Sequence, residues 1–143
     1  MEGHYETEDE IRTLVEAFEA CTFHPSEFRH HQHLTVALWY VWHLSPEKAI
    51  TKMTNGIRRL AETYGKMGYH ETITLFWLRI VLHFVASQGK NRSLTSTVNA
   101  LIEDHDKDFI QQFYSAAVLD SDRAKAEWVE PDLKRLPSLG VAE

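Results

Sequence analysis

The chain has 143 residues, of which 43% are apolar and 25% are charged, and its net charge is −6. These values are typical of one globular domain and exclude an intrinsically disordered chain. The Lys and Arg residues are scattered rather than gathered in a basic stripe, which argues against nucleic acid as a partner.

The cysteine count and the N-terminus predict a cytoplasmic protein. Cys21 is the single cysteine and can form no internal disulfide, and the first ten residues lack the basic start and apolar stretch of a signal peptide. No apolar stretch reaches the roughly 20 residues that span a bilayer, so no membrane partner is expected. Whether the chain forms a homodimer is left open.

Helical periodicity recurs along the chain, whereas the alternation expected of strands is absent. Thr7 to Glu10 reads as a capping box that opens a first helix ending near Cys21. A second helix begins after residue 26 and ends before Ser45-Pro46. That pair, an N-cap followed by proline, opens a third helix ending around Gly65 or Gly68.

The fourth predicted helix runs from about Tyr69 to Ser87 and is apolar on two opposite sides, which is typical of a central helix. Ser93 is expected to cap a fifth helix. A sixth is predicted from about Lys107 to Leu119, and Ser121 is expected to cap a short seventh ending at Trp128.

The fold prediction is therefore an all-α, single-domain bundle of five to seven helices, residues 1–143, around the fourth helix. The tail, residues 131–143, contains two prolines and is expected to be irregular.

Histidine is the unusual component, with nine residues, five of them between positions 24 and 43. On the second helix, His30 and His33 are separated by three positions and lie at the edge of the apolar face. Both rings can therefore contact the same bound group. An H-x-x-H pair of this kind is a familiar metal-binding arrangement in helical bundles. His31 is an alternative to His33.

The fourth helix opens with a second candidate pair, His70 and Glu71, and both side chains are predicted to face protein. Placing them opposite His30 and His33 gives three imidazoles and one carboxylate. This donor set suits a divalent ion such as Zn²⁺, Fe²⁺, Mn²⁺, Ni²⁺ or Cu²⁺.

The chemistry expected of this site is metal-dependent action on a small molecule, with Glu71 as fourth ligand or general base. Tyr69 and Thr74 would hydrogen-bond the substrate or support the ligands. Two alternatives stay open: a metal-free acid–base enzyme that uses His70 and Glu71, and a non-catalytic helical binding module.

Ordinary structural roles compete with each of these interpretations, since buried polar groups are normally satisfied by neighbouring groups. A core histidine bonded to a carboxylate needs no metal. Cys21 and His24 have ligand-like spacing but no second pair to complete a zinc site, so packing is the better interpretation. The tryptophans at 39, 42 and 77 are expected in the core.

Three segments carry a resemblance: F-x-H-x-x-H-L at residues 28–34, Y-H-E-T-x-T at residues 69–74, and P-D-L at residues 131–133. In these the chain resembles an uncharacterised family of small bacterial all-helical proteins. The resemblance covers most of the chain and implies a role for His30, His33, His70 and Glu71, favouring His33 over His31. It implies no particular reaction.

Overall fold

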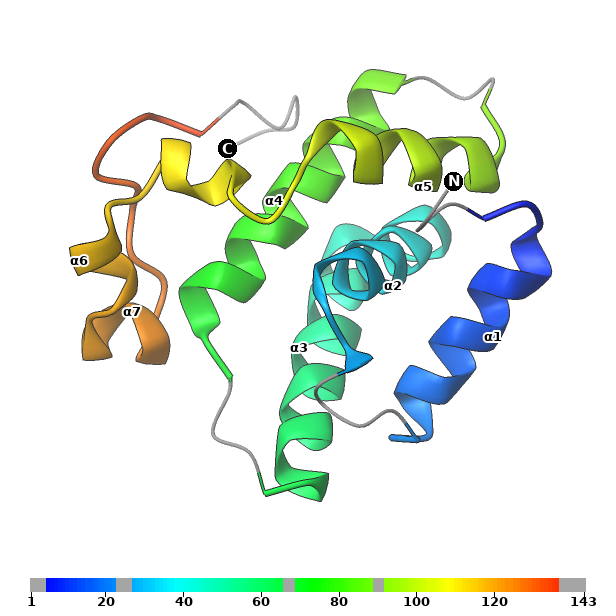
Figure 1. Cartoon of the computed structure of the whole chain (residues 1–143), viewed down its shortest axis with the longest axis horizontal. Helices are drawn as coiled ribbons and strands as arrows, with labels where there is room; N and C mark the ends of the chain where they lie inside the picture. The colour runs from blue at the N-terminus through cyan, green and yellow to red at the C-terminus, as the bar shows by residue number, and fades with distance from the viewer. Residues whose placement is uncertain (1–4, 23–26, 66–68, 89–91, 137–143) are drawn as a thin grey trace.

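In the computed structural model the helices pack around one hydrophobic core, and Figure 1 shows how they are arranged. The structure describes residues 5–22, 27–65, 69–88 and 92–136, and within these ranges it contains helices and no strand. This confirms the all-α prediction. The elements are α1 (Glu8–Glu19), α2 (His30–His43), α3 (Pro46–Thr63), α4 (Glu71–Gln88), α5 (Leu94–Asp104), the 3-10 helix η2 (Phe109–Gln112), α6 (Ala116–Leu119) and α7 (Asp122–Ala126).

Side-chain caps fix where three of the long helices begin. Thr7 accepts a hydrogen bond from the backbone of Glu10 and forms the predicted capping box of α1. Ser45 caps α3 and Ser93 caps α5 in the same way. Each cap satisfies a backbone N–H that has no partner inside its helix, so these starts are set by local sequence.

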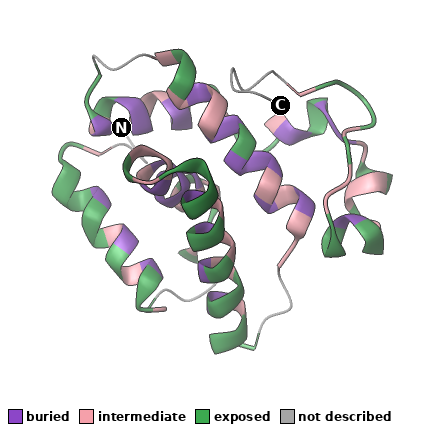
Figure 2. Cartoon of the chain, turned by 180° about the vertical axis from the view of Figure 1, so that it is seen from behind, coloured by how far each residue is buried: buried purple, intermediate pink, exposed green. Residues whose placement is uncertain are grey.

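Helices α2 and α4 share the centre of the bundle. α4 packs against α2, α3, α5 and α7, as expected for the most apolar helix, and α2 packs against α1, α3, α4 and α5. Buried residues line both helices, while the outer faces of α1 and α3 are exposed (Figure 2). The contact between α2 and α4 therefore determines which of their residues can meet.

The prediction of one continuous sixth helix from about Lys107 to Leu119 is wrong. The chain forms η2, leaves helical structure around Tyr114, and starts again as α6. Ser115 explains the break: its hydroxyl accepts from the amide of Val118 as an N-cap, and its own amide donates to Asp132 at 2.9 Å. A cap and a long-range partner outweigh the helical periodicity at this point.

Helices α1 and α3 approach closely where α3 has a glycine. A Cβ atom at Gly56 would lie 2.3 Å from Cε2 of Phe18, which is fully buried. Any side chain at this position would require the Phe18 ring to shift.

The segment after α7 is attached to the beginning of α4. The buried hydroxyl of Thr72 donates to the carbonyl of Glu127 at 2.8 Å and accepts from the amide of Val129 at 3.2 Å. Residues 131–136 form no helix, as predicted, and the rest of the expected irregular tail lies outside the described residues.

None of the helices in the described ranges is both long enough and apolar enough to cross a membrane.

Candidate functional site

A pocket of about 350 Å³ lies where α2 and α4 begin. Its polar wall residues are Arg29, His30, His33, His70, Thr74 and Lys107, and its apolar wall residues are Phe28, Ile57, Ile73, Trp77 and Ile110. We call it the histidine pocket. Helices α2, α3 and α4 and the segment before and within η2 all contribute to it. Its volume falls within the range of small-molecule sites.

His30 is the first residue of α2, and its ring is held by a main-chain group. Its Nε2 lies 2.7 Å from the carbonyl oxygen of His105, which can only accept, so Nε2 carries the proton. The ring also meets the edge of Trp77, at 4.7 Å between centroids. Nδ1 therefore holds a lone pair, and it forms no hydrogen bond with the described residues. Burial lowers the pKa of His30.

His33 lies one turn further along α2, and its Nε2 atom is buried without a hydrogen-bond partner in the described structure. Burial, assisted by the nearby His30, lowers its pKa to about 4, so the ring is neutral at neutral pH. A buried nitrogen without a partner costs about 1–3 kcal/mol. A ligand group that bonded to this atom would recover that cost.

His70 lines the same pocket, but both of its nitrogens are already used. Nε2 donates to the carbonyl of Leu119 at 2.7 Å, and Nδ1 accepts from the amide of Ile73 at 3.2 Å. The second bond caps the first turn of α4, which has no Ser, Thr, Asp or Asn at this position. His70 thus has a structural role in addition to its place in the wall.

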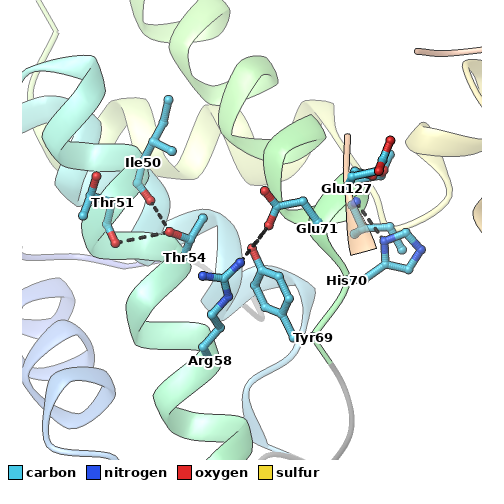
Figure 3. A network of polar contacts seen from close by, with 10 residues as sticks. Ile50, Thr51, Thr54, Arg58, Tyr69, His70, Glu71 and Glu127 are labelled. Carbon is cyan, nitrogen blue, oxygen red and sulfur yellow. Dashed lines mark hydrogen bonds and ion pairs between the residues drawn. The ribbon is translucent and has the colours of Figure 1, made fainter. Parts of the chain in front are cut away.

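Glu71 is not one of the wall residues of the histidine pocket, and its carboxylate is bonded to Tyr69 and Arg58. Its carboxylate accepts a hydrogen bond from Tyr69 and lies 3.3 Å from Nη2 of Arg58 on α3. The Arg58 guanidinium also stacks over the Tyr69 ring at 4.6 Å. Figure 3 shows these three side chains turned toward one another, with His70 apart from them.

Thr74 connects this group to the pocket. It is nearly fully buried, it lines the histidine pocket, and it influences the pKa of Tyr69. Burial and the adjacent Glu71 raise the pKa of Tyr69, which therefore stays protonated and donates to Glu71. Thr74, Tyr69, Glu71 and Arg58 form a chain that leads outward from the pocket wall.

The predicted metal ligands are therefore divided between two places, with His30, His33 and His70 at the pocket and Glu71 beside Arg58. Among the described residues, no three His, Cys, Asp or Glu side chains are grouped so as to hold one metal ion. The alternative ligand His31 is exposed, in contrast to His33.

The other predicted groups are distributed differently. Cys21 is a free, partly buried cysteine, while His24 lies outside the described residues. Trp77 is buried as expected, and it belongs to the pocket as well as to the core. Trp39 and Trp42 are partly buried and pack against the core.

Sequence reasoning missed Arg29 and Lys107 as wall residues. Both are exposed, and neither forms an ion pair in the part of the chain that the structure describes. Arg29 directly precedes the predicted histidine pair, which was a usable signal. Lys107 had none, because its segment was predicted to be part of a continuous helix.

Compared with family models, curated proteins and solved structures, the chain matches none of them.

Proposed function

We propose that the protein binds a small molecule in the histidine pocket and acts on it through the neutral imidazole of His33. The observation that carries this proposal is that His33, a wall residue of the pocket, has a buried Nε2 atom with no hydrogen-bond partner among the described residues. Nearly all buried polar atoms are paired, so an unpaired one at a pocket indicates a missing partner.

The low pKa of His33 defines the chemistry it would supply. A group with a pKa of about 4 is a weak base at neutral pH, so His33 would be a poor general base. A neutral imidazole can instead donate or accept a hydrogen bond and polarise a carbonyl or similar group of the ligand. His33 would serve as an orienting and polarising group.

Thr74 is the second side chain proposed to touch the ligand, because it is a nearly fully buried polar residue of the wall. Tyr69 and Glu71 stand behind it and would act by positioning Thr74, with Arg58 neutralising the carboxylate.

The test is a screen of uncharged polar fragments by protein-observed NMR. Fragments that bind are expected to shift the indole signal of Trp77 and the ring signals of His33. Ile73→Trp, which places a large side chain in the wall, should abolish these shifts. Ala86→Trp, an exposed change on the same helix, should leave them intact. Fragments that bind only elsewhere would contradict the proposal.

A divalent metal ion is the second candidate occupant. His30 and His33 are both biased toward the neutral form, as ligation requires, and each keeps a nitrogen without a partner in the described residues. The bond from His30 Nε2 to a carbonyl is also the kind of support that metal-bound histidines usually have. Such an ion would take these two protein ligands and complete its shell with ligand or water, unless His70 gave up its bond to Ile73.

Metal analysis and thermal melts of untagged protein test this candidate. Bound metal should be close to one equivalent, and EDTA should lower the melting temperature, because a ligand of the folded state stabilises it. His30→Ala and His33→Ala should each lose the metal, whereas the exposed His31→Ala should keep it. If no divalent ion changes the melting temperature, a metal ion is excluded as the occupant. The small-molecule proposal would not be affected.

A further inference from the structure

The charged side chains in the described wall of the histidine pocket are cationic, although the chain as a whole is acidic. Arg29 and Lys107 belong to the wall, and no Asp or Glu is among the described residues that line it. Neither cation forms an ion pair in the described ranges, although the chain has 21 Asp and Glu residues against 15 Lys and Arg. Two cations that form no ion pair with a described residue therefore flank a pocket in a protein of net charge −6.

The backbone adds to this positive field. α2 begins at His30 and α4 at Glu71, so the N-terminal ends of two long helices meet at the pocket. The N-terminus of a helix carries a partial positive charge and unpaired N–H groups, which favour an anion. Two carboxylates oppose this field: Asp106, which acts on His30 electrostatically, and Glu71, the first residue of α4. Neither is one of the wall residues.

The rest of the wall is apolar and aromatic. Phe28, Ile57, Ile73, Trp77 and Ile110 supply this surface, and Trp77 and Ile110 are buried. A bare inorganic ion would leave this surface unused, whereas a molecule with an apolar body would cover it.

We infer that the histidine pocket selects a small organic anion, with its acidic group toward Arg29 and Lys107 and its apolar body against Trp77. This inference rests on the proposed function and adds the class of ligand. A carboxylate and a phosphate monoester share the required chemistry. In the complex His33 hydrogen-bonds a polar atom of the anion, and the two cations neutralise its charge.

The experiment compares three probes of similar shape by protein-observed NMR titration: phenylacetate, phenyl phosphate and the uncharged phenylacetamide. At least one anion should bind about tenfold or more tightly than phenylacetamide, and its affinity should fall as salt is raised. The stronger of the two anions identifies the acidic group. Shifts should include the indole of Trp77.

Charge variants locate the interaction. Lys107→Gln and Arg29→Gln should each lower the affinity for the anion by about threefold to tenfold. The affinity for phenylacetamide should stay the same. Arg92→Gln is the control. Arg92 is also exposed, but it precedes α5, whereas His105 and Lys107 follow the other end of that helix. Its loss should not change the affinity for the anion.

Each remaining outcome has a distinct meaning. Equal binding of phenylacetamide and the anions would overturn the choice of an anion and leave the proposed function intact. Anion binding that is insensitive to Lys107→Gln and Arg29→Gln would also overturn it. If none of the probes shifts Trp77, the inference fails, and the uncharged fragment screen decides the proposed function independently.

Discussion

His30 and His105 are joined across the bundle by a 2.7 Å hydrogen bond from an imidazole Nε2 to a main-chain carbonyl. The two residues are 75 positions apart, and His105 is itself held by a bond from its Nδ1 to the carbonyl of Leu101 at 2.9 Å. The end of α5 thus fixes the orientation of a ring at the start of α2.

The first prediction is that His30 is a neutral ring with its proton on Nε2. The carbonyl of His105 requires this tautomer, and burial opposes protonation of the ring. Long-range ¹⁵N–¹H correlation spectra of histidine-labelled protein at pH 7 should show a protonated Nε2 and an unprotonated Nδ1. The reverse tautomer would contradict the geometry.

The second prediction concerns the stability of the protein in mild acid. The pKa of His33 falls from 6.5 in the unfolded chain to about 4 in the folded one, so the unfolded state binds the proton more readily between these values. Stability is complete above pH 6.5 and decreases as the pH falls toward 4, by roughly 3 kcal/mol from this group.

Urea unfolding between pH 7 and pH 4 measures this effect. Acidic residues also titrate in this range, so the informative quantity is the difference between the protein and its His33→Gln variant. The variant should lose less stability on acidification. The exposed His31→Gln is the control and should follow the unmodified protein, and a variant at position 33 with the same pH profile would disprove the assignment.

The third prediction is that Glu71→Gln costs little stability. The ion pair with Arg58 is partly exposed, with 51% of the Arg58 side chain accessible, so its loss should cost less than about 1 kcal/mol. The amide oxygen can still accept from Tyr69. Chemical denaturation gives the stability, and fragment binding to the histidine pocket should change only slightly. A variant that folds normally but loses all pocket binding would place Glu71 in direct contact with the ligand.

The fourth prediction concerns Thr72, which attaches the C-terminal segment to α4. Thr72→Val keeps the shape of the side chain but leaves the carbonyl of Glu127 and the amide of Val129 without their partner. A loss of about 1–3 kcal/mol is expected, together with faster hydrogen exchange at the Val129 amide. Thr51→Val, on the exposed face of α3, should change neither quantity by a comparable amount.

The fifth prediction is that Gly56→Ala destabilises the protein. Helix propensity alone would favour alanine by about 1 kcal/mol, but the new Cβ would overlap the ring of Phe18. Forcing that ring aside should cost about 1–3 kcal/mol and exceed the gain. Urea denaturation decides the sign. The exposed neighbouring change Asn55→Ala should be neutral or stabilising, so a more stable Gly56→Ala protein would show that Phe18 can move.

Local sequence was sufficient to predict most of the fold. The caps at Thr7, Ser45 and Ser93 and the helical spacing of apolar residues locate α1, α3 and α5, because both signals act within a few residues. The same signals failed between residues 107 and 119, where the partner of the Ser115 amide is Asp132. A contact across 17 positions cannot be read from periodicity.

The site was predictable only in part, for a similar reason. Helical geometry correctly places the side chain of Glu71 against other parts of the protein, but it cannot tell which residue of another helix lies opposite. That residue is Arg58, so the carboxylate pairs with it, and Glu71 is not a wall residue of the pocket beside His30 and His33. The buried state of His33 Nε2 likewise depends on how several segments pack around it.

The imidazole of His70 offers a single lone pair, and the first turn of α4 already uses it through the amide of Ile73. A metal ion or a ligand donor at Nδ1 would compete directly with that amide. Occupation of His70 would therefore free the Ile73 N–H and loosen the beginning of a core helix. The hydrogen-exchange rate of the Ile73 amide would therefore show whether Nδ1 of His70 has bound another partner.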